Sequence, residues 1–112
     1  MQSYATPRSS GFVTKGTLIN AGTVEPAKVV CPGGGVAQMI VIRNRQAAGG
    51  VDLLVRIEDR RLDAVPATLV GRTDIFIVSP GQELGLPALT SQLLLQAADA
   101  TTVIEANIAW LC

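Results

Sequence analysis

The sequence contains no histidine, only two lysines and only two cysteines. Without histidine the chain has no Ser-His or Cys-His catalytic pair, no histidine general acid or base, and no imidazole ligand for zinc or non-haem iron. Its serines have no G-x-S-x-G context, and no base stands beside either cysteine in the sequence. We therefore expect a protein that is not an enzyme and that uses no cofactor and no metal ion.

Charge is also scarce and balanced. Nine basic and nine acidic residues cancel, and charged residues make up 16% of the chain, against about 25% in an average protein. A neutral chain without a basic block is a poor nucleic-acid binder. Its 48% hydrophobic content argues against disorder. No apolar run is long enough to span a membrane, and residues 1–8 lack the apolar core of a secretory signal.

The two cysteines, Cys31 and Cys112, can form at most one disulfide. A chain of 112 residues buries enough surface to fold without one. We interpret both as reduced thiols in a reducing compartment, and a single buried disulfide remains the alternative.

The hydrophobic pattern predicts an all-β protein. Residues 1–11 are polar and rich in turn formers, so we expect a flexible N-terminal arm there. Residues 12–112 form a single domain of short strands separated by Gly, Pro, Asn and Asp. Seven to nine strands with little helix indicate an antiparallel β-sandwich, with a jelly-roll-like arrangement as one form of it.

The expected strands fall within residues 12–20, 25–31, 36–43, 51–58, 67–79, 82–86, 92–98 and 101–111. Residues 58–65 fit either a short helix or a loop, ended by Pro66.

Three of these segments carry more detailed expectations. Residues 36–43 are apolar at both parities, which predicts a strand covered on both faces. Residues 51–58 alternate, which predicts a strand with one buried face, joined to the previous strand by a hairpin loop at residues 44–50. The last two strands are expected to form a terminal antiparallel hairpin.

Two segments resemble binding or catalytic motifs but lack the residues that such motifs require. Residues 31–35 (CPGGG) lack the Gly-Lys-Ser/Thr of a phosphate-binding loop and precede a strand, not a helix, so we expect a tight surface loop. The acidic residues of 52–63 interleave with arginines, a pattern typical of a solvated, salt-bridged surface. Neither a carboxylate active site nor a calcium loop is expected there.

Arginine outnumbers lysine seven to two. Arginine is enriched at protein interfaces because its planar guanidinium makes bidentate contacts and is weakly hydrated. A GC-rich coding bias is the alternative explanation. The candidate interface residues are Tyr4, Arg8, Arg43, Arg45, Arg60, Arg61 and Arg72.

The high apolar content also indicates an interface with another protein. Val41, Phe76, Leu94 and Val103 each stand beside other apolar residues, so apolar side chains occupy both faces of several strands. A single sandwich has one core, and the second faces must be covered by loops, by an additional element or by a partner. We therefore expect a homo-oligomer.

The C-terminal third resembles a known class of protein. Pro80-Gly-Gln-Glu-Leu is followed by a short strand, a Thr-rich turn and a final strand, within residues 86–110 (LPALTSQLLLQAADATTVIEANIAW). Together with the size, the polar arm and the scarcity of Lys and His, this ending resembles small all-β virion proteins of tailed bacteriophages, in particular capsid decoration or cement proteins. The resemblance is detailed over residues 75–112 and assigns no role to individual residues.

What the resemblance implies is a structural protein that oligomerises, often as a trimer, and stabilises a capsid from its outer surface. Its partners would be other copies of itself and the major capsid protein or other virion subunits, with no nucleic acid and no membrane. It would be assembled in the host bacterial cytoplasm and reside in the virion. The alternatives are a head–tail joining, tail or fibre-base subunit and, further away, a carbohydrate-binding β-sandwich module.

Overall fold

The computed structural model describes residues 12–31, 36–58, 66–87 and 90–111, and for residues 12–19 it describes the backbone alone. These residues form eight β-strands and no helix. The strands are β1 (Phe12–Asn20), β2 (Ala27–Val30), β3 (Met39–Asn44), β4 (Leu53–Glu58), β5 (Phe76–Val78), β6 (Glu83–Leu86), β7 (Gln92–Ala97) and β8 (Glu105–Leu111).

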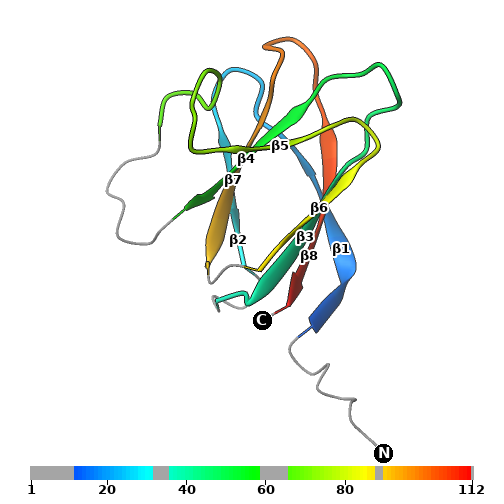
Figure 1. Cartoon of the computed structure of the whole chain (residues 1–112), viewed down its shortest axis with the longest axis vertical. Helices are drawn as coiled ribbons and strands as arrows, with labels where there is room; N and C mark the ends of the chain where they lie inside the picture. The colour runs from blue at the N-terminus through cyan, green and yellow to red at the C-terminus, as the bar shows by residue number, and fades with distance from the viewer. Residues whose placement is uncertain (1–11, 32–35, 59–65, 88–89, 112) are drawn as a thin grey trace, which may run out of the picture.

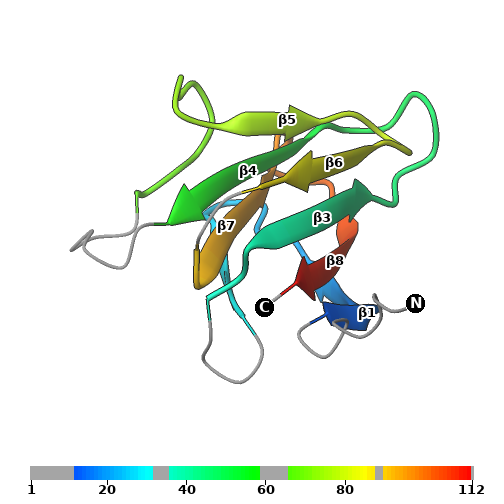
Figure 2. The same cartoon turned by 60° about the horizontal axis from the view of Figure 1, so that its bottom comes forward.

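The strands build two four-stranded sheets that pack face to face (Figures 1 and 2). One sheet has the order β1-β8-β3-β6 and the other has the order β2-β7-β4-β5. Every pairing between strands is antiparallel. The predicted all-β antiparallel sandwich is confirmed.

The pairings are nested along the chain. β4 pairs with β5, β3 with β6, β2 with β7 and β1 with β8, so the strands pair outward from the middle of the sequence. Two further pairings, β3 with β8 and β4 with β7, join these pairs side by side into the two sheets. The chain thus resembles one long hairpin that has been folded over.

The core lies between the two inner faces. In β8 burial alternates strictly, and Ala106, Ile108 and Trp110 point inward. Together with Ile104, just before the strand, they are at most 1% exposed. They pack against inward residues of the opposite sheet such as Leu53. The face predicted from the sequence for this strand is therefore correct, and the period of two places it there.

Both predicted hairpins are wrong. The hairpin loop predicted at residues 44–50 lies in the connection 45–52 between β3 and β4, and residues 98–104 link β7 to β8, but in each case the two strands belong to different sheets. β7 is already flanked by β2 and β4, and β8 by β1 and β3. A central strand has only two edges for hydrogen bonding, so each connection crosses the gap between the sheets instead of turning back on itself.

The other boundaries follow the sequence with small shifts. β3 begins at Met39, three residues later than expected, and the segment 67–79 yields only the three-residue β5. Asp99 accepts hydrogen bonds from the backbone N–H (2.8 Å) and hydroxyl (2.9 Å) of Thr101, which shapes the turn after β7. The arm at 1–11, Cys112 and the helix-or-loop segment after Glu58 lie outside the described residues.

The coverage of β3 and β4 is the reverse of the prediction. β3 was expected to be covered on both faces, but Met39 is 40% exposed and Val41 is only half-buried. β4 was expected to have one open face, but Leu54 on its outer face is 5% exposed. The cause is the path of the chain after Pro66, which passes over the outer face of β4 and β7.

That path forms a small second core. Leu69 is fully buried against Leu54 and Leu94, with Ile75 packed beside them. The side-chain oxygen of Gln96 accepts a hydrogen bond of 2.6 Å from the backbone N–H of Leu69. Loop 66–75 therefore covers part of the apolar surplus that the sequence places on second faces.

We expect Leu69→Ala to lower the free energy of unfolding by about 2–4 kcal/mol, because it removes a fully buried side chain. Val70→Ala is the matched control, since Val70 is 51% exposed and should change stability by less than about 0.5 kcal/mol. Urea unfolding followed by Trp110 fluorescence measures both. Equal effects of the two substitutions would show that the loop does not pack as described.

Candidate interaction surface

The candidate interface residues fall in separate places. Arg43 and Arg45 lie together at the end of β3, whereas Arg72 lies in loop 66–75 on the opposite sheet. Tyr4, Arg8, Arg60 and Arg61 lie outside the described residues. The structure therefore brings together two of the seven candidates and separates a third from them.

A buried asparagine fixes the position of the first pair. Asn44 is 0% exposed, and its side-chain amide donates hydrogen bonds to the backbone carbonyls of Val51 (3.0 Å) and Val78 (2.9 Å). Its side-chain oxygen accepts a bond of 2.9 Å from the N–H of Gln46. One side chain thus ties the end of β3 to the start of β4 and the end of β5.

Beside this tie lies an open polar depression of about 270 Å³, lined by Arg43, Asn44, Arg45, Gln46 and Gly81. Gly81 has a φ of 76°, a value that a residue with a Cβ rarely adopts. Its N–H donates a 3.0 Å bond to the carbonyl of Asn44, so the β5–β6 turn closes one side of the depression. The arrangement places two exposed arginines at the end of the central strand β3.

Both arginines have acidic neighbours. The guanidinium of Arg43 lies 3.7 Å from the carboxylate of Glu83, and both side chains are more than half exposed. The backbone N–H of Arg45 donates a 3.1 Å bond to the carbonyl of Glu105, which places these two residues side by side. Exposed ion pairs contribute little to stability, so these charges remain available to a partner.

The outer face of β3 and β8, which we name the β3–β8 face, continues from these charges. Its outward residues are Met39, Val41, Arg43, Glu105, Asn107, Ala109 and Leu111. One end of the face is apolar and the other is charged or polar. Of these residues, the sequence named Arg43 as an interface candidate and Val41 as part of the apolar surplus, and it did not single out the other five. The strict alternation of residues 104–111 was the signal that could have found the part on β8.

A second apolar surface lies at the edge strand β5. Phe76 is 43% and Ile77 is 58% exposed, and β5 ends its sheet. An edge strand carries backbone donors and acceptors with no neighbouring strand to pair with. The sequence flagged Phe76 as surplus, but it could not show that the strand lies at an edge.

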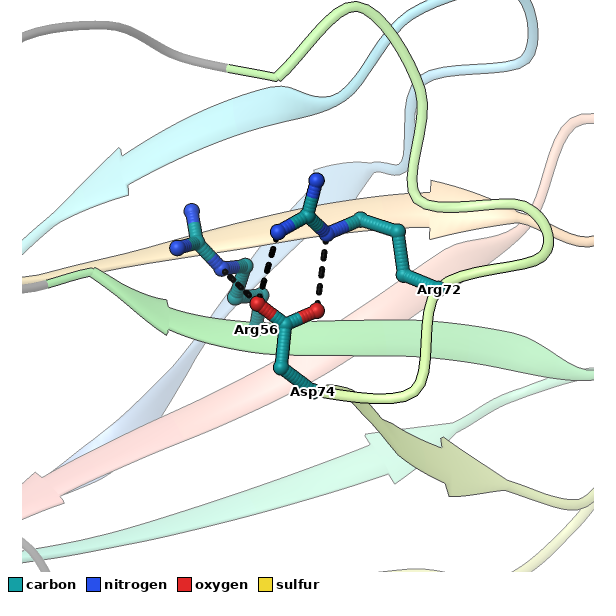
Figure 3. Close-up of polar contacts among 3 residues, drawn as sticks. All are labelled: Arg56, Arg72 and Asp74. Atoms are coloured by element: carbon teal, nitrogen blue, oxygen red, sulfur yellow. Dashed lines mark hydrogen bonds and ion pairs between the residues drawn. The ribbon is translucent and has the colours of Figure 1, made fainter.

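Arg72 belongs to a cluster on loop 66–75 (Figure 3). Its guanidinium donates two hydrogen bonds of 2.7 Å to the carboxylate of Asp74, and Arg56 of β4 donates a third of 3.2 Å. The hydrogen bonds from Arg72 lower the pKa of Asp74 from its usual 3.8 to about 2. Arg72 is thus engaged within the loop, and the hydrogen bond from Arg56 to Asp74 joins the loop to β4.

Glu58, at the end of β4, is less solvated than the sequence predicts. Glu58 is 3% exposed, and its carboxylate lies 3.9 Å from the ammonium of Lys28, which is half-exposed. Its other carboxylate oxygen has no hydrogen-bond partner among the described residues. The alternation of residues 51–58 predicted a solvent-exposed outer face for β4, and Glu58 lies on that face.

Among the residues that the structure describes, no group of metal-ligating side chains could hold an ion. The same part of the chain contains no helix long and apolar enough to cross a membrane. Comparisons with protein-family models, with curated proteins and with solved structures found no match to this chain. The geometry of the sandwich and its open surfaces therefore provide the basis for inferring a function.

We expect Asn44→Ala to lower the free energy of unfolding by about 2–4 kcal/mol, because it removes the side-chain donor to the buried carbonyl of Val78 and the part-buried carbonyl of Val51. Asn20→Ala, at an exposed position at the end of β1, is the matched control and should have little effect. Thermal unfolding measured by circular dichroism compares them. A small effect at position 44 would contradict the role of the tie.

Asp74 should titrate with a midpoint near 2. Because this pKa is lower in the folded state than its usual 3.8, the carboxylate stabilises the loop fully above pH 3.8, and this stabilisation is lost as the pH falls through about 2. Arg72→Gln should raise the midpoint toward 3.8. NMR titration of the side-chain carboxyl carbons measures both proteins.

Asp99 provides an internal control in the same spectra. Its pKa is also lowered, but by hydrogen bonds from Thr101 and Thr102. Arg72→Gln should therefore leave the Asp99 midpoint where it is. An Asp74 midpoint that does not move in Arg72→Gln would contradict the hydrogen bonding described for the cluster.

Proposed function

We propose that this chain is a non-enzymatic structural subunit of a tailed-phage virion, which associates with copies of itself and binds the outer surface of the capsid as a decoration or cement protein. The observation that carries the proposal is the nested antiparallel pairing of eight strands in two sheets. We propose that this order is a jelly roll, an arrangement that recurs in viral capsid domains. Because a fold does not determine a function, further support must come from the surface.

The surface supports association with other proteins. The β3–β8 face and the β5 edge both leave apolar side chains exposed, as interface residues are in an isolated subunit. Loop 66–75 covers the outer face of the opposite sheet near Leu54 and Leu94. The other exposed large apolar residues among those described lie singly, at the end of β2 (Val30) or between strands (Val24, Val36, Val70 and Val103). The β3–β8 face and the β5 edge fit a subunit whose neighbours complete the burial.

The proposed mechanism is mass action. A protein that binds the assembled capsid and not its separate subunits stabilises the capsid by the free energy of that binding. Many weak contacts repeated by the symmetry of the capsid add avidity without requiring any one contact to be strong. Self-association would add further contacts between neighbouring sites.

The alternatives predict other surfaces or other copy numbers. A head–tail joining, tail or fibre-base subunit shares every structural feature above. A carbohydrate-binding module needs exposed aromatic rings, and Trp110 is 1% exposed whereas Phe76 at the β5 edge is 43% exposed. Phe76 is therefore the one aromatic ring with a described, exposed side chain on which a sugar could stack.

The test is to purify phage particles by density gradient from the host that produces the chain and to count its copies by quantitative mass spectrometry. Decoration predicts a copy number that matches the repeating sites of the capsid, and removal of the chain should lower the temperature at which capsids rupture. A copy number that matches a single ring would favour the joining-protein alternative. Absence from purified particles would overturn the virion proposal.

A further inference from the structure

We propose that the β3–β8 face pairs with the same face of a second copy about a two-fold axis that runs parallel to the strands, midway between β3 and β8. This proposal deepens the self-association in the proposed function by naming the face and the symmetry. It rests on the register of the two strands and on the chemistry of the residues that the register brings side by side.

The register places unlike charges and like apolar groups in the same rows. Across β3 and β8, Met39 pairs with Leu111, Val41 with Ala109, and Arg43 with Asn107. The 3.1 Å backbone hydrogen bond between Arg45 and Glu105 continues this pattern by one more outward row. The outward rows therefore comprise two apolar pairs, one pair of arginine with asparagine and one pair of opposite charges, with one member of each pair on each strand.

A two-fold axis along the midline exchanges the two strands. When two copies pack face to face about this axis, each outward residue of β8 faces its own row partner on β3 of the second copy. The apolar rows then meet apolar rows. In the row beyond Asn107, the Glu105 carboxylate of each copy faces the Arg45 guanidinium of the other, so the contact forms twice, as an isologous interface requires.

The exposure of these residues fits a face that is completed by a partner. Met39 is 40% exposed, and Val41, Ala109 and Leu111 are half-buried, while the alternate residues of both strands are buried. A Cβ added at Gly85 of β6 would lie 3.5 Å from the terminal methyl of Met39. Because Gly85 has no side chain, β6 does not project above the outer face beside Met39 and Val41.

The size of the face sets the expected strength. Four strands spaced about 4.8 Å apart, each rising about 3.4 Å per residue, give a face of about 19 Å by 24 Å over the length of β8. This area, about 460 Å², is below the roughly 800 Å² per partner that stable interfaces bury and lies in the range of weak, transient ones. We therefore expect a dimer that dissociates on dilution, and one whose charged row makes it weaker at high salt.

The test exchanges charges between copies. In Glu105→Arg, arginine faces arginine across the axis, and in Arg45→Glu, glutamate faces glutamate, so each variant alone should dimerise at least about 100-fold more weakly. An equimolar mixture of the two variants restores opposite charges in both rows and should form a heterodimer. Sedimentation velocity over a concentration series and native mass spectrometry measure this. The heterodimer separates a contact between copies from an effect within one chain.

Controls keep the result decisive. Glu25→Arg makes the same change of charge at an exposed position of the β1–β2 turn and should leave the dimer intact. Val41→Lys should disrupt the dimer, whereas Val24→Lys, at a position 75% exposed, should not. Circular dichroism checks that every variant folds. If a variant of the charged row fails to fold, the comparison of positions 41 and 24 still decides the question.

Three outcomes would overturn the proposal: a monomer at all concentrations, a trimer, or a dimer that Glu105→Arg and Val41→Lys leave unchanged. The virion proposal fails separately. A chain that dimerises through this face but is absent from particles overturns the virion role alone, and a monomer found on particles overturns the dimer alone.

Discussion

Each strand of this sandwich can bury only every second side chain between the sheets, and the rest of the molecule follows from that limit. The inner positions of β3, β4, β7 and β8 are filled by large aliphatic residues and Trp110, nearly all fully buried. The chain nevertheless carries apolar residues at outer positions too. These residues need a second cover, and among the described residues only loop 66–75 supplies one, on part of the opposite sheet.

The two sheets therefore differ in how complete they are. On the outer face of β4 and β7, the loop that carries Leu69 forms a second core, held by Gln96 and by the ion cluster of Asp74. The outer face of β3 and β8 keeps half-buried apolar groups next to charged ones. A mixture of this kind is typical of surfaces that associate reversibly, with an apolar part and a polar margin.

The sequence predicted the strands better than it predicted their neighbours. Residue composition and flanking turn residues located β1 and β6, and the period of two located the buried face of β8, because both are local properties of the sequence. They failed for the connections 45–52 and 98–104, since whether two successive strands pair depends on which edges are already occupied by strands far away in the sequence. The sequence also predicted a covered outer face for β3 and an open one for β4, the reverse of what is found. The loop that covers β4 has no periodic pattern of its own that could have revealed this. Of the candidate interface, Arg43 and Arg45 were found from residue type, while the apolar rows beside them required the register.

The nested order of the strands has a consequence for how the protein is made. The innermost pair, β4 with β5, closes the shortest loop, and each pair further out must wait for longer loops to close, which makes folding slow. β8 lies between β1 and β3, yet it is synthesised after both. Until β8 leaves the ribosome, β1 and β3 have no strand between them and expose their edges. The face that we assign to pairing therefore does not exist on the nascent chain, so copies growing side by side on one messenger RNA cannot join through it too early.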